Sequence, residues 1–133
     1  MRISIIIPSY NGGGQLKGLL PSFDIAKSES NEFEILIVDN NSHDDSEKYV
    51  KDKFPDIQFI KLSSNCGFTG ACNAGTKVAK GEYLLFLNND CHITKEAIDT
   101  MIQFLENNKE FVATQPVVMS QKSKERGRKW GGN

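Results

Sequence analysis

One short polar segment of this chain combines residues that could bind a metal and a phosphate. Asn88, Asn89 and Asp90 follow an apolar run that ends at Leu87. A carboxylate at the end of a rigid, buried strand is well placed to hold a divalent cation, Mn²⁺ or Mg²⁺, against a phosphorylated ligand. Asp90 is therefore the candidate metal ligand.

Three further polar segments also follow apolar runs. Tyr10 offers a flat face on which a nucleobase can stack, and Asp39 can accept hydrogen bonds from a base N–H or a ribose hydroxyl. Gly67 lets backbone N–H groups at the start of a following helix approach a phosphate. The segments are Pro8-Ser9-Tyr10-Asn11, Asp39-Asn40-Asn41-Ser42 and Asn65-Cys66-Gly67-Phe68.

The elements that must position these segments alternate between strands and helices. Strands are predicted at 3–7 (stopped by Pro8), 34–38, 57–62, 81–87 and 112–119, the last with Pro116 at an edge or bulge. Helices are predicted around Leu16–Leu20 (interrupted at Pro21), from Ser42 or Asp44 to Lys53, and at 69–79 and 94–107. This alternation predicts an α/β domain with a mostly parallel sheet and helices on both faces. In such a sheet the four polar segments converge on one ligand.

Composition fits one ordinary soluble domain. The chain has 133 residues, of which 38% are hydrophobic and 25% charged, enough to build a core. Its net charge of −1 gives no general electrostatic case for nucleic acid. Three cysteines without framework spacing, no signal peptide and no long apolar run predict a cytoplasmic location.

Taken together and in order, the segments resemble the GT-A glycosyltransferases of family 2, and most of all the rhamnosyltransferase-like branch. The resemblance covers roughly the first 120 residues and rests on Ser4–Asn11, Ile37–Ser42, Asn65–Gly75 and Gly81–Asp90. It implies a single Rossmann-like GT-A nucleotide-diphospho-sugar-binding domain at 1–120, followed by a basic, irregular segment at 121–133. The implied enzyme transfers a sugar from a nucleotide-diphosphate donor to a glycan or lipid-linked acceptor in bacterial cell-surface polysaccharide synthesis.

The resemblance also implies roles for single residues. Asp90 is the expected contact of a divalent cation, Mn²⁺ or Mg²⁺. Asn88 stands where the family's Asp-x-Asp motif has its first acid, so we expect weak metal binding until a diphosphate supplies further ligands. The expected donor-binding residues are Pro8, Ser9, Tyr10, Asn11, Asp39, Asn41, Asn65, Gly67, Asn73, Asn88 and Asn89.

No general base is assigned. In the family this Asp or Glu lies in a C-terminal half that also shapes the acceptor site. The final Trp130-Gly131-Gly132-Asn133 is an unusual domain end, and we expect a truncated chain that is the donor-binding half. One alternative is a non-catalytic nucleotide-sugar-binding fragment. A dinucleotide-binding oxidoreductase fits less well, because Gly12 and Gly14 would need a third glycine at Lys17.

Structural roles are left open for some of these residues. Tyr10 could be an aromatic at the core edge, Asp39 could cap the following helix, and Asp90 could cap a helix near Thr94. The expected partners are the nucleotide-diphospho-sugar donor and the glycan or lipid-linked acceptor, without nucleic acid. The basic stretch 122–129 leaves open peripheral association with the acidic inner face of a membrane. A homodimer is also left open.

Overall fold

The computed structural model describes residues 3–23 and 33–120. The chain divides into two compact units, 1–92 and 93–133. The elements are β1 (Ile3–Ser9), α1 (Gly13–Leu19), the short 3-10 helix η1 (Leu20–Ser22), β2 (Phe33–Asp39), α2 (Ser46–Lys53), β3 (Gln58–Lys61), α3 (Gly67–Val78), β4 (Tyr83–Phe86) and α4 (Lys95–Asn107). Of these described elements, α4 alone falls in the second unit.

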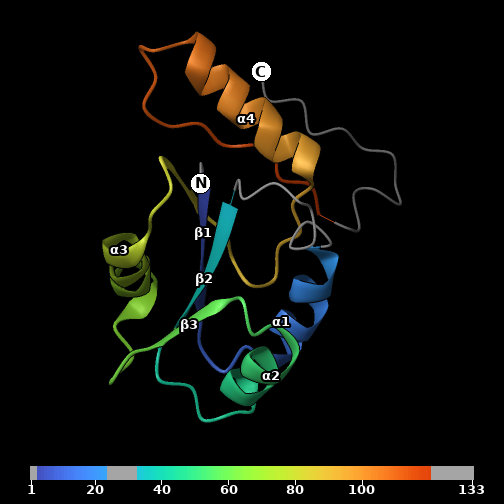
Figure 1. Ribbon diagram of the computed structural model, residues 1–133, viewed down its shortest axis with the longest axis vertical. Helices are drawn as coiled ribbons and strands as arrows, with labels where there is room; N and C mark the ends of the chain where they lie inside the picture. The colour runs from blue at the N-terminus through green and yellow to red at the C-terminus, as the bar shows by residue number, and fades with distance from the viewer. Residues whose placement is uncertain (1–2, 24–32, 121–133) are drawn as a thin grey trace. The chain divides into compact units, whose positions relative to one another are not determined.

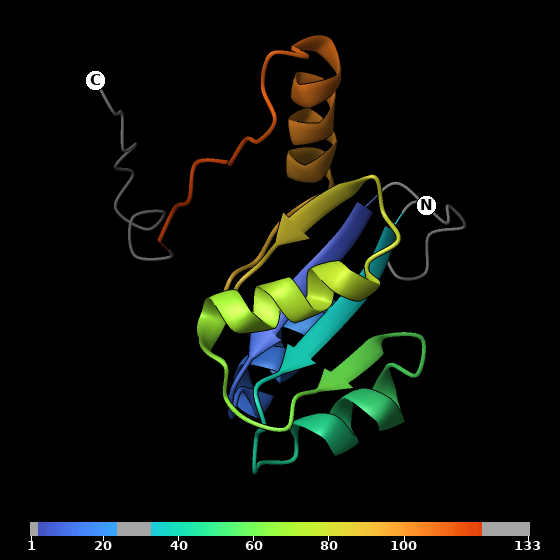
Figure 2. The ribbon, with the colours of Figure 1, turned by 90° about the vertical axis from the view of Figure 1, so that its left-hand side faces the viewer.

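The first unit is built on a parallel sheet with the strand order β3-β2-β1-β4. Its apolar strands β1 and β2 are central and buried, as expected for strands covered on both faces. Helix α3 lies on one face, and α1 and α2 lie on the other (Figures 1 and 2). The predicted α/β fold with helices on both faces is confirmed.

Helix α3 packs very close to the sheet. Ile6, Leu36 and Val38 form a buried cluster with Ala71 of α3. A Cβ atom at Gly75 would lie 2.6 Å from the side chain of Ile6, so a larger residue there would push α3 outward. This packing fixes the N-terminal end of α3 next to the ends of the strands.

The sequence predicted that the first strand stops at Pro8, but β1 continues to Ser9. Ile6 O accepts the N–H of Leu87 on the β4 side, whereas Ser9 O accepts the N–H of Asn40 on the β2 side. Because alternate residues of a parallel strand face the same neighbour, Pro8 faces the β4 side, beyond the last residue of β4. Its missing N–H costs no ladder bond there, and the strand continues.

Other boundaries also differ from the predictions. Helix α1 ends before Pro21 as expected, and Thr94 caps α4, since its hydroxyl accepts the N–H of Ala97 at 3.2 Å. Asp90 is therefore not the cap of α4. Helix α2 begins at Ser46, and α3 begins at Gly67, two residues earlier than predicted.

The strand predicted at 112–119 is wrong. That segment is irregular, and its apolar side chains are exposed, with Val112 at 97%. A strand needs a partner for its N–H and C=O groups, and Pro116 removes one donor from the segment. The basic segment 121–133 lies outside the described residues. Within the described part of the chain, no helix is long and apolar enough to cross a membrane.

Candidate functional site

A pocket of about 410 Å³ lies in the first unit, at the carboxyl ends of the four strands. Each strand's following loop contributes to its wall, as the parallel topology requires. The lining residues are Pro8, Ser9, Tyr10, Asn40, Asn65, Gly67, Phe68, Asn88, Asn89 and Asp90. The four polar segments singled out in the sequence therefore meet around one cavity.

Two aromatic rings stand exposed in the pocket wall. Tyr10, just after β1, is 50% exposed, and Phe68, in the first turn of α3, is 56% exposed. Large apolar side chains are normally covered, so two exposed rings at one pocket suit a flat ligand. Tyr10 is not an aromatic of the core edge.

The end of β4 is tied to the end of β1. Nδ2 of Asn89 donates a hydrogen bond to Oγ of Ser9 at 3.2 Å. A Cβ atom at Gly12 would overlap both of these side-chain ends. The absence of a side chain at Gly12 therefore leaves space for the contact between Ser9 and Asn89.

Asp90 is exposed at the pocket, next to the exposed Asn88. A turn from Cys91 N–H to Asn88 O, at 3.1 Å, shapes the segment. Burial raises the pKa of the Cys91 thiol, and the neighbouring Asp90 carboxylate raises that pKa further. Cys91 is thus a neutral thiol at neutral pH.

The pocket offers an incomplete set of metal ligands. In residues 3–23 and 33–120, no group of three His, Cys, Asp or Glu side chains could hold a metal ion. One carboxylate, from Asp90, and the amide oxygen of Asn88 suit a hard cation that takes its other ligands from phosphate and water. The donor set fits a metal shared with a diphosphate and does not fit a closed protein site.

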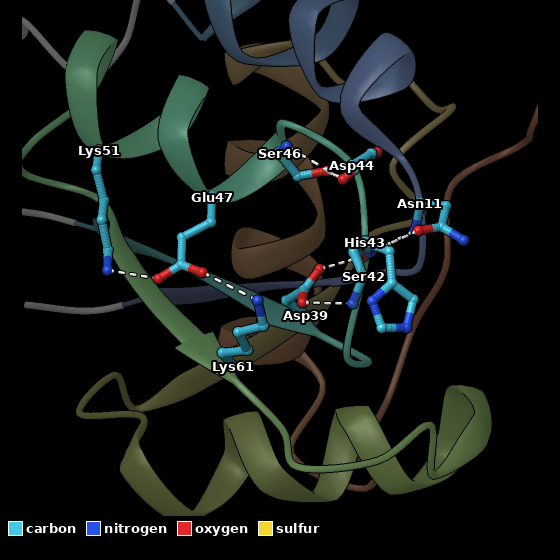
Figure 3. A network of polar contacts seen from close by, with 9 residues as sticks. All are labelled: Asn11, Asp39, Ser42, His43, Asp44, Ser46, Glu47, Lys51 and Lys61. Carbon is cyan, nitrogen blue, oxygen red and sulfur yellow. Dashed lines mark hydrogen bonds and ion pairs between the residues drawn. The ribbon is translucent and has the colours of Figure 1, made fainter.

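Asp39 organises the loop that follows β2 (Figure 3). The side chain is buried, with 1% exposed, and its carboxylate accepts hydrogen bonds from both the N–H (2.8 Å) and the hydroxyl of Ser42. Oγ of Ser42 in turn accepts the N–H of Asn11 at 2.8 Å, and Oδ1 of Asn11 accepts the N–H of His43 at 2.9 Å. These bonds lock the loop after β1, which carries Tyr10, to the loop after β2.

A second carboxylate, Asp44, joins the starts of two helices. It accepts hydrogen bonds from the N–H of Gly13, at the start of α1, and from the N–H and hydroxyl of Ser46, at the start of α2. Burial acts to raise the pKa of Asp44, but these bonds outweigh it and lower the pKa below its usual value. Neither Ser42 nor Asp44 occupies the N-cap position of α2, which is Asp45 and makes no side-chain cap bond; Asp44 instead accepts the N–H of Ser46, the first residue of the helix.

Four predicted donor-site residues do not line the pocket. Asn11 and Asp39 hold together the loops that form its wall, through the hydrogen bonds with Ser42 and His43 described above. Asn41 lies in the loop after β2 with a left-handed φ of 65°, and Asn73 is exposed on α3. Asn65 does line the pocket, and its Oδ1 accepts the N–H of Gly67 at 2.9 Å.

Two lining residues, Asn40 and Phe68, were not among the predicted site residues. Both stand inside the polar segments that carried the prediction. The signal for Phe68 was an apolar ring in a polar loop just before a helix. Asn40 gave no local signal, because the partners of its side chain, Cys66 and Gly67, lie far away along the chain.

Comparison with known proteins shows the family of the chain. The sequence profile described as glycosyl transferase family 2 matches residues 4–132. The chain belongs to glycosyl transferase family 2. The branch of this family to which it belongs stays a prediction.

Relatives of known name are bacterial glycosyltransferases. The chain is 35% identical over 112 residues to a poly(ribitol-phosphate) beta-glucosyltransferase of Bacillus spizizenii. This match covers 81% of this chain and 18% of the relative. It is 34% identical over 111 residues to the Escherichia coli enzyme WfaP, named as a UDP-Glc:alpha-D-GlcNAc-diphosphoundecaprenol beta-1,3-glucosyltransferase; the match covers 82% of this chain and 43% of WfaP. The chain thus spans less than half the length of these relatives.

Solved structures agree with the family assignment. Staphylococcus aureus TarS in complex with UDP-GlcNAc matches with a TM-score of 0.70 and 30% identity, over 82% of this chain and 32% of that one. A Pyrobaculum calidifontis mannosyltransferase in complex with GDP-Man and Mn²⁺ matches with a TM-score of 0.69 over 78% of this chain and 32% of that one. At 20% identity this second likeness shows the fold alone.

Proposed function

We propose that the pocket binds the nucleotide part of a nucleotide-diphospho-sugar donor. The observation that carries the proposal is the meeting of Tyr10, Gly67 and Asp90 around one cavity at the ends of parallel strands. These three residues supply a stacking face, a close approach for phosphate and a carboxylate for a cation. TarS, which is bound to UDP-GlcNAc in its solved structure, shares this fold at 30% identity and supports the proposal.

Each part of the donor has a counterpart in the wall. The base stacks on Tyr10, while Asp39 and Asn11 hold the loop that carries this ring. Gly67 has a backbone φ of 71°, which residues with a side chain rarely adopt, and it lets the backbone at the start of α3 approach the phosphates. Asp90 and Asn88 hold the divalent cation, Mn²⁺ or Mg²⁺, which neutralises charge on the departing diphosphate.

The whole protein, in this proposal, transfers the donor's sugar to a glycan or lipid-linked acceptor of the bacterial cell surface. The names of the relatives support this, since they specify poly(ribitol-phosphate) and a diphosphoundecaprenol-linked sugar as acceptors. A lipid-linked acceptor would bring the protein to the cytoplasmic face of the membrane. No general base is assigned to this chain.

A thermal-shift panel of UDP, GDP, dTDP and CDP, each with Mn²⁺, tests the proposal. One of these nucleotides at about a hundred times its Kd should stabilise the chain by about 2.7 kcal/mol, because only the folded state has the pocket. Stabilisation by none of the four would contradict the proposal. NAD serves as the control, and stabilisation by NAD alone would favour the oxidoreductase alternative.

Binding and transfer need separate measurements. Release of UDP from a UDP-sugar in the presence of an acceptor, compared with binding of the same donor, separates a transferase from a module that only binds. Donor binding without turnover by the complete protein would favour the non-catalytic alternative.

A further inference from the structure

The side chain of Asn40 makes two hydrogen bonds to the turn that begins α3. Its Oδ1 accepts the N–H of Cys66 at 3.1 Å, and its Nδ2 donates to the carbonyl oxygen of Gly67 at 3.1 Å. The oxygen and the nitrogen of the amide therefore both bond to adjacent residues of this turn. Asn40 itself is buried, with 4% of its surface exposed.

The backbone of Asn40 is anchored on the opposite side. Its N–H donates to the carbonyl oxygen of Ser9 at 2.8 Å, which joins it to the end of β1. A single residue thus connects the ends of β1 and β2 with the start of α3. Because the sheet fixes the position of Asn40, its side chain can hold the more exposed turn in place.

The turn into α3 that Asn40 holds carries three pocket residues. Asn65, Gly67 and Phe68 all line the cavity, and none of them is buried. Gly67 has a left-handed φ of 71°, so the chain reverses direction there just before the ring of Phe68. Within the turn, Oδ1 of Asn65 accepts the N–H of Gly67, whereas the two bonds from Asn40 tie the turn to the end of β2.

We propose that Asn40 is a positioning residue of the donor site, which holds the turn at Gly67 and thereby fixes the ring of Phe68 against the ligand. This inference rests on the proposed function for the identity of the ligand. The amide of Asn40 offers the donor and the acceptor that the Cys66 N–H and the Gly67 carbonyl require. An apolar side chain would remove both of these hydrogen bonds, and the turn would no longer be tied to the end of β2.

A double-mutant cycle tests this mechanism. The variants are Asn40→Ala, Phe68→Ala and the two combined, and the readout is the Kd of the best-binding nucleoside diphosphate of the panel, with Mn²⁺. Loss of two hydrogen bonds that hold the ring should weaken binding about tenfold in Asn40→Ala. In the Phe68→Ala background the same change should weaken binding by less than about twofold, because the group it positions is gone.

Val50→Ala is the control for stability alone. Val50 is fully buried in α2, so its truncation lowers the melting temperature without touching the pocket. It should leave the Kd unchanged at a temperature where all variants are folded by circular dichroism. A Kd within about twofold of wild type for Asn40→Ala, or effects of the two substitutions that simply multiply, would overturn the inference.

Hydrogen exchange gives a readout that does not depend on nucleotide. In Asn40→Ala the Cys66 N–H loses its acceptor, so its exchange should become at least about tenfold faster while amides of β1 and β2 stay protected. Unchanged exchange at Cys66 would overturn the inference whatever the nucleotide does. Absence of nucleotide binding in the wild type would instead contradict the proposed function, so the two failures are distinguishable.

Discussion

The side-chain amide of Asn89 donates a hydrogen bond to the hydroxyl of Ser9, and this contact joins the loops after β4 and β1. Both residues line the pocket. Since Asn88 and Asp90 flank Asn89, the contact also fixes where the candidate metal ligand stands relative to the loop that carries Tyr10.

Substitution of Gly12 should break this contact without unfolding the protein. In Gly12→Ala the new methyl group overlaps the ends of Ser9 and Asn89, which can rotate away. We expect nucleotide affinity to fall by about three- to tenfold, as for loss of one hydrogen bond, measured by calorimetric titration.

Gly14→Ala is the matched control for Gly12→Ala. Nothing lies within 4 Å of a Cβ atom at Gly14, and the residue is inside α1. This change should leave the affinity unchanged and add about 0.5–1 kcal/mol of stability, because alanine favours helix. Equal affinities for the two alanine variants would contradict a role for the Ser9–Asn89 contact.

The ring of Tyr10 is expected to carry the stacking energy of the base. Tyr10→Ala should weaken nucleotide binding by about 1–3 kcal/mol, or about five- to 150-fold in Kd, whereas Tyr10→Phe should keep most of the affinity. Because Tyr10 is half exposed, neither change should cost much stability. A Tyr10→Phe variant as weak as Tyr10→Ala would show that the hydroxyl, and not the ring, binds the ligand.

Asp44 should make the stability of the chain depend on acid pH. Its pKa is lowered in the folded state, so its contribution is complete above the unfolded value near 3.8 and is lost as the pH falls through the folded pKa. Asparagine keeps the shape of the side chain but loses the charge that strengthens its hydrogen bonds to Gly13 and Ser46. Asp44→Asn should therefore destabilise the protein by about 0.5–1 kcal/mol at pH 7, where solvent screens the exposed group, and by less below pH 3.8.

Urea unfolding of both proteins at pH 7 and at pH 3 measures this difference. Asp52→Asn is the control, because Asp52 makes only an exposed pair with Lys48. A loss of stability in Asp44→Asn that is the same at both pH values would mean that the charge of Asp44 does not matter.

The carboxylate of Asp90 should make nucleotide binding depend on metal. Asp90→Ala should abolish the gain in affinity that Mn²⁺ gives the wild type, while leaving the fold and the metal-free affinity intact. Asp56→Ala, at an exposed acid in the turn between α2 and β3, is the matched control and should keep the full Mn²⁺ effect. The wild type without nucleotide should bind Mn²⁺ weakly, and tight binding there would contradict a metal shared with the diphosphate.

Much of the fold follows from the pattern of apolar runs. Continuous β-branched runs such as Ile3–Ile7 indicate strands buried on both faces, and their alternation with helical stretches predicts the parallel sheet. Parallel topology then predicts that the following polar loops converge, which is how Tyr10 and Asp90 could be placed at one site from sequence.

What sequence could not predict depends on partners distant along the chain. Pro8 continues its strand because β4 has already ended beside it, and Asn40 matters because it reaches residues 26 positions away. The segment 112–119 has the composition of a strand but no pairing partner in the described structure. Pairing is a property of neighbours and leaves no mark in the segment itself.

The central claim is that a nucleoside diphosphate binds among the four loops at the strand ends. Amide chemical shifts of ¹⁵N-labelled protein, followed during titration with the best-stabilising nucleotide and Mg²⁺, test it most directly. We expect the largest changes at Tyr10, Asn40, Gly67 and Asn89, with none in the exposed face of α2. Saturable changes that leave these four amides unmoved and gather elsewhere would contradict the account.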